Sequence, residues 1–273
     1  MKGTSFILLP ICAILLAGCS NDGPKTDGGG TTGASTPKSG KAPAPGKVSK
    51  LKIDDVKEGT GRGAEDGDIL VLLYRGTLTN GTEFDSNMDS SGNANTQKEL
   101  FQLPLGMGQV IKGWDQGLKG IKVGGERKLS IPADLGYGDQ ANGSIPPNSD
   151  LFFDVKCLDI IHKGEELVID PTDEKVGTGP AVKQGDDVTI HFVGKLLSGK
   201  QFDSTRDKNS PLTFKVGNHD VLACLEEGVV GMKKGGLRKL HVPPMAAAGG
   251  NPASGIPMNQ VLIFEVEVLK IGK

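Results

Sequence analysis

The stretch FQLPLGMGQVIKGWDQGLKGIKVGGER (residues 101–127) returns in altered form as LTFKVGNHDVLACLEEGVVGMKKGGLR (residues 212–238). From this stretch the two copies stay in register, at an offset of 111 residues, to the end of the chain. Upstream, the tripeptide FDS begins at Phe84 and again at Phe202, at an offset of 118. Because a repeat of this length is far longer than a solenoid unit, the chain of 273 residues is predicted to hold two whole domains.

Both copies consist largely of short apolar runs that end at Gly or Pro, a pattern typical of β-strands. Helical periodicity is scarce, and the best helix candidate covers residues 110–120, bounded by glycines. The fold class is therefore predicted to be α+β, with an antiparallel sheet and one short helix in each copy. We place the domains at residues 50–163 and 164–273. The expected strands cover residues 69–74, 129–132 and 151–157 in the first copy and 188–193, 240–243 and 261–269 in the second.

The N-terminal region has the pattern of a signal peptide, predicted over residues 1–18. Lys2 precedes an apolar run from Phe6 to Leu16, which is shorter than the roughly 20 residues of a membrane-spanning helix. The following LAGC resembles the bacterial lipobox, which assigns Cys19 as a lipidation site; an ordinary secretory signal with a chance Cys is the alternative. Residues 19–49 are predicted to be the lipidated Cys and a disordered tether. This tether has no helical periodicity that would suggest a dimerisation helix, so we expect a monomer.

Composition and motif context argue against several other classes. The net charge is −2 with dispersed Lys and Arg, which argues against a nucleic-acid partner. The four His lack metal-ligand spacing, so neither a metal site nor a cofactor is expected. The Gly-rich turns at Gly59 and Gly177 precede strands, whereas a phosphate loop follows one. The FDS serines lack a nucleophile elbow, which argues against a hydrolase. Cys157 is expected in the core, and a disulfide to Cys224 is not expected because the two lie in different domains.

Four segments of the first copy carry a family resemblance: YRGTLTNGTEFDS at residues 74–86, the stretch at 101–127, LSIPADLGYG at 129–138 and IPPNSDLFFDV at 145–155. They resemble the FKBP-type peptidyl-prolyl isomerases, the macrolide-binding immunophilins. The resemblance implies two tandem FKBP-like domains, each a bent antiparallel β-sheet wrapped around a short α-helix, with a binding pocket between sheet and helix. It covers nearly all of residues 50–160, and the second copy follows the same frame with losses at the functional positions.

The chemistry of this family needs a pocket and no nucleophile. Isomerisation of an X–Pro bond crosses a barrier of about 18–20 kcal/mol without breaking a covalent bond, so a dry apolar pocket that favours the twisted amide suffices. The resemblance assigns catalytic roles to Tyr74, Asp85 and Tyr137, with Asp85 beside Tyr74. It makes Trp114 the pocket floor, and it makes Phe84, Phe101, Val110, Ile111, Ile145 and Phe153 substrate-binding residues. The Ile111 N–H and the Tyr137 hydroxyl would hold substrate carbonyls. Because buried Tyr and Trp need polar partners, this set is not expected in a plain core.

The second copy keeps the frame but lacks the polar aromatic residues. Phe192, Leu225 and Ala248 stand where the first copy has Tyr74, Trp114 and Tyr137. We therefore predict a weak or inactive isomerase that serves as a binding module or spacer. The second-domain equivalents of the site residues are Phe192, Phe202, Asp203, Leu212, Val221, Leu222, Leu225, Ile256 and Phe264.

The first copy also carries an insertion between Asp85 and Phe101. Its polar sequence, NMDSSGNANTQKE, is expected to form a loop at the pocket rim. Two interpretations stay open, contact with clients and a tolerated surface insertion, of which the second is the commoner case.

The sequence thus predicts a peptidyl-prolyl cis-trans isomerase that assists the folding of exported proteins at a membrane surface, with activity mainly in the first domain. The alternative is a non-catalytic protein that binds proline-containing segments or acts as a chaperone. The expected partners are proline-containing polypeptide clients, with macrolide-type ligands as a further class, and the membrane through lipidated Cys19. The protein is expected to lie outside the cytoplasm, anchored by lipid to a bacterial membrane. Ser20 after Cys19 resembles outer-membrane sorting and favours the outer membrane, facing the periplasm.

Overall fold

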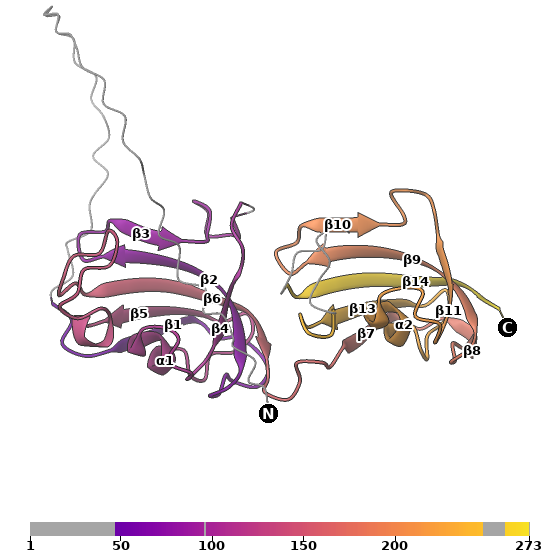
Figure 1. The fold of residues 1–273 in the computed structure, drawn as a ribbon, viewed down its shortest axis with the longest axis horizontal. Helices are drawn as coiled ribbons and strands as arrows, with labels where there is room; N and C mark the ends of the chain where they lie inside the picture. The colour runs from indigo at the N-terminus through magenta and orange to yellow at the C-terminus, as the bar shows by residue number, and fades with distance from the viewer. Residues whose placement is uncertain (1–46, 96, 248–259, 273) are drawn as a thin grey trace, which may run out of the picture.

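The computed structural model describes residues 47–95, 97–247 and 260–272. Two antiparallel sheets of six strands lie side by side, and each curves around one short helix (Figure 1). The fold is the α+β arrangement of two tandem domains that the sequence predicts. The signal peptide, Cys19 and most of the tether lie outside the described residues.

The first sheet has the strand order β1-β5-β6-β2-β3, and β4 pairs with β2. Its strands are β1 (Lys52–Lys57), β2 (Ile69–Leu78), β3 (Glu83–Ser86), β4 (Phe101–Pro104), β5 (Glu126–Ile131) and β6 (Leu151–Ile161). Helix α1 (Lys112–Gly117) lies on one face, and a 3-10 turn, η1 (Ala133–Leu135), follows β5. The alternation of β2 sends Leu70 and Leu72 into the core under α1 and sends Val71 and Leu73 to the opposite face.

The second sheet repeats this plan, with β7 in the place of β1. Its order is β10-β9-β14-β13-β7, β11 pairs with β9, and β8 and β12 form a separate pair. The pairing register is also repeated, since Leu78 opposite Leu151 corresponds to Leu196 opposite Leu262. The elements are β7 (Asp170–Lys175), β8 (Thr178–Ala181), β9 (Asp187–Leu196), β10 (Gln201–Ser204), β11 (Leu212–Lys215), α2 (Ala223–Gly228), β12 (Lys233–Lys234), β13 (Leu237–Val242) and β14 (Leu262–Gly272).

All six expected strands are confirmed in place, although most extend beyond the predicted bounds. The expected helix over residues 110–120 is too long, because α1 covers only Lys112–Gly117. Ile111 has an extended backbone conformation, with φ −59° and ψ 144°, and stands at the helix N-terminus. At the other end Gly120 has φ +74°, a left-handed conformation that cannot continue a helix. The predicted helix is longer because apolar residues, such as Ile111 and Leu118, also flank the helix itself.

The insertion between Asp85 and Phe101 is more than a polar loop at the rim. Met88 and Leu100 are buried against Val71 and Leu73, on the sheet face opposite the α1 core. The buried Asn87 side chain accepts the Tyr74 N–H at 2.7 Å and donates to the Leu72 carbonyl at 3.0 Å. The loop prediction therefore holds for residues 89–95 and 97–99, which are half-buried or exposed, but the two ends of the segment pack on the sheet through Asn87, Met88 and Leu100.

Cys157 and Cys224 are free and buried, and the core position expected for Cys157 is confirmed. Burial raises the pKa of Cys157 to about 12 and that of Cys224 to about 11, so neither is a reactive thiolate near neutral pH.

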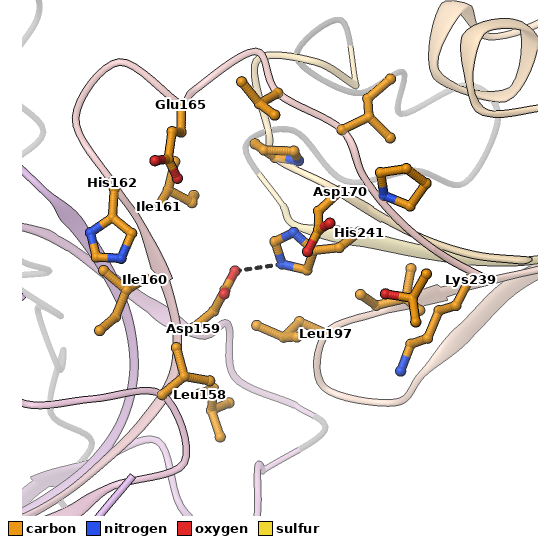
Figure 2. Close-up of a pocket in the computed structure, with 17 residues that line it drawn as sticks. Leu158, Asp159, Ile160, Ile161, His162, Glu165, Asp170, Leu197, Lys239 and His241 are labelled. Carbon is orange, nitrogen blue, oxygen red and sulfur yellow. Dashed lines mark hydrogen bonds and ion pairs between the residues drawn. The ribbon is translucent and has the colours of Figure 1, made fainter. Parts of the chain in front are cut away.

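The two domains meet through an apolar cluster and a hydrogen bond between Asp159 and His241. The first domain contributes Val71 and Leu73, and the second contributes Leu197 and Val261. Next to this cluster the Asp159 carboxylate of β6 lies 2.8 Å from His241 Nε2 of β13 (Figure 2). A cavity of about 750 Å³, lined by β6, the following linker and β13, lies beside the pair. The register places Thr79 and Asp150 of the first copy at the positions of Leu197 and Val261. The second copy thus carries apolar residues where it contacts its neighbour.

Exchanging these two residues for their first-copy counterparts, in a Leu197→Thr and Val261→Asp variant, is expected to separate the domains. The buried Val261 loses apolar burial worth about 1.5–3 kcal/mol and the half-buried Leu197 loses less, and the new carboxylate would need water. Small-angle scattering should show a larger radius of gyration. The control is Leu167→Thr on the linker, where the side chain is already 66% exposed. Unchanged scattering of the double variant would contradict a docked arrangement held by these contacts.

Candidate active site

The first domain encloses a box of aromatic rings above α1. The Trp114 ring, from α1, has its centroid 5.5 Å from that of Tyr74, 5.6 Å from that of Phe101 and 5.1 Å from that of Phe153. All three pairs are close to perpendicular, the edge-to-face geometry that aromatic rings prefer. Phe84 extends the box by packing against Phe153 at 5.5 Å. The structure thus brings together rings from β2, β3, β4, β6 and α1.

Packing of the Phe84 ring requires a glycine, which sequence reasoning did not single out. A Cβ atom on Gly76 would lie 2.5 Å from the Phe84 ring and 2.9 Å from that of Phe153. In the second domain, Gly194 has the same relation to Phe202, at 2.6 Å. The tripeptide YRG is visible in the sequence, but nothing in it shows that the glycine makes room for the Phe84 ring, eight residues further along the chain.

Tyr74 and Asp85 form the polar edge of this box. The Tyr74 hydroxyl donates a hydrogen bond to Asp85 Oδ2. Burial raises the pKa of Tyr74 well above its usual range, and the Asp85 carboxylate adds to the shift. Tyr74 therefore keeps its proton throughout the physiological range and acts as a fixed donor. Lys98, from the insertion, places its ammonium 3.9 Å from the other Asp85 oxygen.

Ile111 and Tyr137, which pack at the edge of the same apolar cluster, line a shared cavity of about 500 Å³. The Ile111 carbonyl accepts the first backbone bond of α1, from Trp114 N at 2.9 Å. Its own N–H has no hydrogen-bond partner among the residues that the structure describes. Burial, and secondarily the charge of Asp85, raises the pKa of Tyr137, so its hydroxyl is also a donor. The Ile111 N–H and the Tyr137 hydroxyl, which also interacts with the Asn142 side chain, thus border one cavity that Val110 also lines.

The remaining first-domain candidates lie in the same core. Ile145 is buried and belongs to the same apolar cluster as Trp114, with Val110, Ile111, Phe101 and Tyr137 packed at its edge. One expectation fails: the Trp114 indole N–H is buried and finds no polar partner within the described part of the chain. Aromatic rings occupy its surroundings, which leave no acceptor beside it.

The second domain retains the frame of the box without its floor. Phe264 packs against Phe192 at 5.8 Å and against Phe202 at 5.7 Å. Leu225 is buried in the position of Trp114, with Leu212, Val221 and Leu222 packed at the edge of the same cluster. Ala248 and Ile256 lie outside the described residues.

The carboxylate of the second FDS motif has a different partner. Asp203 Oδ1 lies 2.5 Å from Lys208 Nζ, a closer contact than that of Lys98 with Asp85 Oδ1 at 3.9 Å, and no tyrosine hydroxyl donates to Asp203. Since Phe192 has no hydroxyl, this carboxylate serves no donor inside the box.

Within residues 47–95, 97–247 and 260–272, no group of three or more His, Cys, Asp or Glu is placed to hold a metal ion. Across the same ranges, no helix is long and apolar enough to cross a membrane.

Comparison with protein families identifies the repeat. The model of the FKBP-type peptidyl-prolyl cis-trans isomerases matches residues 61–158 and again 179–269. The chain belongs to this family. Among curated relatives, peptidyl-prolyl cis-trans isomerase FKBP10 of Bos taurus is 34% identical over 227 residues, which is 82% of this chain and 38% of the relative. FK506-binding protein 4 of Neurospora crassa is 51% identical over 113 residues, 41% of this chain and 22% of the relative. The chain thus spans less than two fifths of the length of these relatives.

Solved structures of the family are also similar. AtFKBP13 is 35% identical, with 40% of this chain and 91% of that one covered and a TM-score of 0.36. FkpA from Escherichia coli is 36% identical, with 38% of this chain and 48% of that one covered and a TM-score of 0.35.

Proposed function

We propose that the chain is a peptidyl-prolyl cis-trans isomerase that assists the folding of exported proteins, with its activity mainly in the first domain. The observation that carries the proposal is the joint presence, around one apolar box, of the Tyr74–Asp85 pair, the Tyr137 hydroxyl and the unpaired Ile111 N–H. The Tyr137 hydroxyl and the Ile111 N–H are donors at the edge, Asp85 accepts the Tyr74 hydroxyl, and the floor and walls are aromatic and aliphatic side chains. This is the arrangement that a twisted, weakly polar amide needs.

The mechanism is differential binding of the twisted amide. The proline ring enters the aromatic box, where the apolar walls exclude water from the C–N bond. Water stabilises the planar, charge-separated amide, so its exclusion favours the twisted form and lowers the barrier. Ile111 N–H and the Tyr137 hydroxyl hold the carbonyls that flank the bond, and the Tyr74–Asp85 pair keeps one wall fixed. No covalent intermediate is formed.

Replacing Tyr137 by Phe in the full chain is expected to lower kcat/KM for a Leu-Pro peptide about fivefold, since one neutral hydrogen bond is worth about 1 kcal/mol. A protease-coupled or NMR exchange assay measures this. Because Trp114 is the only Trp, its fluorescence should change on titration with the same peptide or a macrolide. If Trp114 fluorescence shows that the peptide binds but the isomerisation rate does not change, the protein binds proline-containing segments without catalysing their isomerisation.

For the second domain we propose a supporting role in client binding. Its box keeps three Phe rings but has Leu225 as a floor and Lys208 on the FDS carboxylate. Such a pocket can take an apolar side chain but lacks the donors that orient an amide. The full chain would then hold clients at two places and isomerise at one.

We further propose that the protein is a bacterial lipoprotein, anchored through Cys19 and facing the periplasm from the outer membrane. The support is the LAGC sequence after an apolar run and the Gly/Ser/Pro-rich tether behind it. Isomerisation consumes no ATP, which suits a compartment outside the cytoplasm.

Cys19→Ser is expected to abolish lipidation and to release the protein from the membrane or leave its precursor uncleaved. Membrane fractionation and mass spectrometry of the N-terminal peptide measure both outcomes. The matched control is Cys12→Ser within the signal sequence, which should leave lipidation intact. Normal acylation and retention of the Cys19 variant would rule the lipobox out.

A further inference from the structure

A buried carboxylate ties the point where the tether enters the first domain to the loop that carries Tyr137. Asp150 is 7% exposed. Its Oδ2 accepts the Val48 N–H at 2.7 Å, and its Oδ1 accepts the Ala133 N–H at 3.2 Å. Val48 and Ala133, where the loop that leads to Tyr137 begins, thus donate their N–H groups to the same carboxylate.

That loop borders the cavity of the candidate active site. Asp134, Gly136 and Tyr137 line the cavity of about 500 Å³ from one side, and Val110 and Ile111 line it from the other. A chain that leaves Val48 in the N-terminal direction thus begins beside the pocket.

The residues immediately upstream have the chemistry that such a pocket takes. Residues 41–46 read Lys-Ala-Pro-Ala-Pro-Gly, with two Ala–Pro bonds. An extended chain covers about 3.4 Å per residue, so Pro45 reaches about 10 Å and Pro43 about 17 Å from Val48. Proline-rich segments are already extended and lose little entropy on binding. Lys41 adds a positive charge, and the exposed Asp134 carboxylate at the cavity has no ion pair within the described part of the chain.

The connection is specific to the first domain. In the second copy the position of Asp150 is Val261, which packs against the first domain instead. The carboxylate that fixes an incoming chain beside the pocket is therefore present only where the aromatic box is complete.

We propose that the Ala42–Pro45 segment is an intramolecular ligand of the first-domain pocket and competes with clients for it. The proposal rests on the proposed function, because it assigns X–Pro binding to this pocket. A short tether gives an effective concentration in the millimolar range. The segment would exclude weakly bound peptides, while clients that bind tightly or at both domains displace it.

The test compares full-length protein with a Pro43→Ala and Pro45→Ala variant. The matched control, Pro24→Ala and Pro37→Ala, removes the same number of prolines farther up the tether. In a competitive arrangement the first variant should lower KM for a Leu-Pro peptide about twofold to tenfold, with kcat unchanged. The control should match the wild type. Trp114 fluorescence of the unliganded protein should also change in the first variant only.

Equal KM values and equal Trp114 fluorescence in all three proteins would overturn the proposal. An effect that grows with protein concentration would also overturn it, because the occupant would then be the tether of a second copy. If no protein shows isomerase activity, the proposed function fails by itself. Fluorescence, together with chemical shifts of isotope-labelled prolines 43 and 45, would still decide whether the tether occupies the pocket.

Discussion

Replacing Arg127 by Met is expected to destabilise the first domain by about 2–4 kcal/mol. The guanidinium is 8% exposed and donates from Nη1 to the carbonyls of Gly117 at 2.8 Å and Lys119 at 2.9 Å. The Gly117 carbonyl is at the end of α1 and the Lys119 carbonyl lies just beyond it, and both would be left unpaired, at about 1–3 kcal/mol each. The contact to Asp55, from Nε at 2.6 Å, adds less because the Asp55 side chain is 55% exposed. Loss of the α1 end would also loosen the Trp114 floor.

The repeat supplies a matched control for this change. Arg238 donates to Gly228 O and Val230 O at 2.9 Å and contacts Asp173 at 2.6 Å. Urea unfolding monitored by Trp114 fluorescence follows the first domain, since no other Trp is present. The Arg127→Met variant should lower that midpoint, while Arg238→Met should lower the circular-dichroism midpoint of the second domain. An unchanged Trp114 transition in Arg127→Met would show that α1 does not depend on the guanidinium.

The Arg238 pair also has an expected pH dependence. Its hydrogen bond lowers the pKa of Asp173, which partial burial opposes. A carboxyl group whose pKa is lower in the folded state stabilises the fold at pH values above its unfolded-state pKa of about 3.9. This contribution is lost as the pH falls through the folded-state pKa. The stability difference between wild type and Arg238→Met should therefore shrink below about pH 4.

The sequence was sufficient to predict the repeat, the strands and the residues of the aromatic box, because each depends on spacing along the chain or on a family motif. It was insufficient where two distant positions change together. A Cβ atom on Gly113 would lie 2.4 Å from Ile131, and the second copy pairs Cys224 with the smaller Val242 there. Neither substitution can be interpreted from the sequence unless the contact between the two positions is known.

The packing of the insertion on the sheet and the domain interface were not predicted, for the same reason. Asn87 looks like one more polar loop residue, yet its amide fixes β2 at Tyr74. Leu197 looks like an ordinary hairpin residue until the register shows that it contacts the neighbouring domain. The tether and Cys19 are matters of sequence alone, and the roles of the individual site residues stay predictions until variants are assayed.

Giving the first pocket the residues of the second, with Tyr74→Phe and Trp114→Leu in the full chain, is expected to lower kcat/KM about 100-fold. Removing the hydroxyl that donates to Asp85 costs about 1.5 kcal/mol, at the lower end for a charged partner because Asp85 is half exposed. Replacing Trp114 removes three edge-to-face contacts worth about 0.5–1.5 kcal/mol each, of which the Leu side chain recovers part.

The two losses should not add fully, because the Tyr74 and Trp114 rings touch, with centroids 5.5 Å apart. The single variants therefore belong in the same experiment, together with Leu212→Ala at the second-domain position of Phe101. That control should stay within about twofold of wild type, since the chemistry is assigned to the other domain. Circular dichroism must show both domains folded in every variant. If the Tyr74 and Trp114 double variant kept its activity while Leu212→Ala lost it, the second domain would be the catalytic one. Its Phe rings and leucine floor would then suffice for isomerisation, and polar donors would not be what distinguishes an active pocket from a packed core.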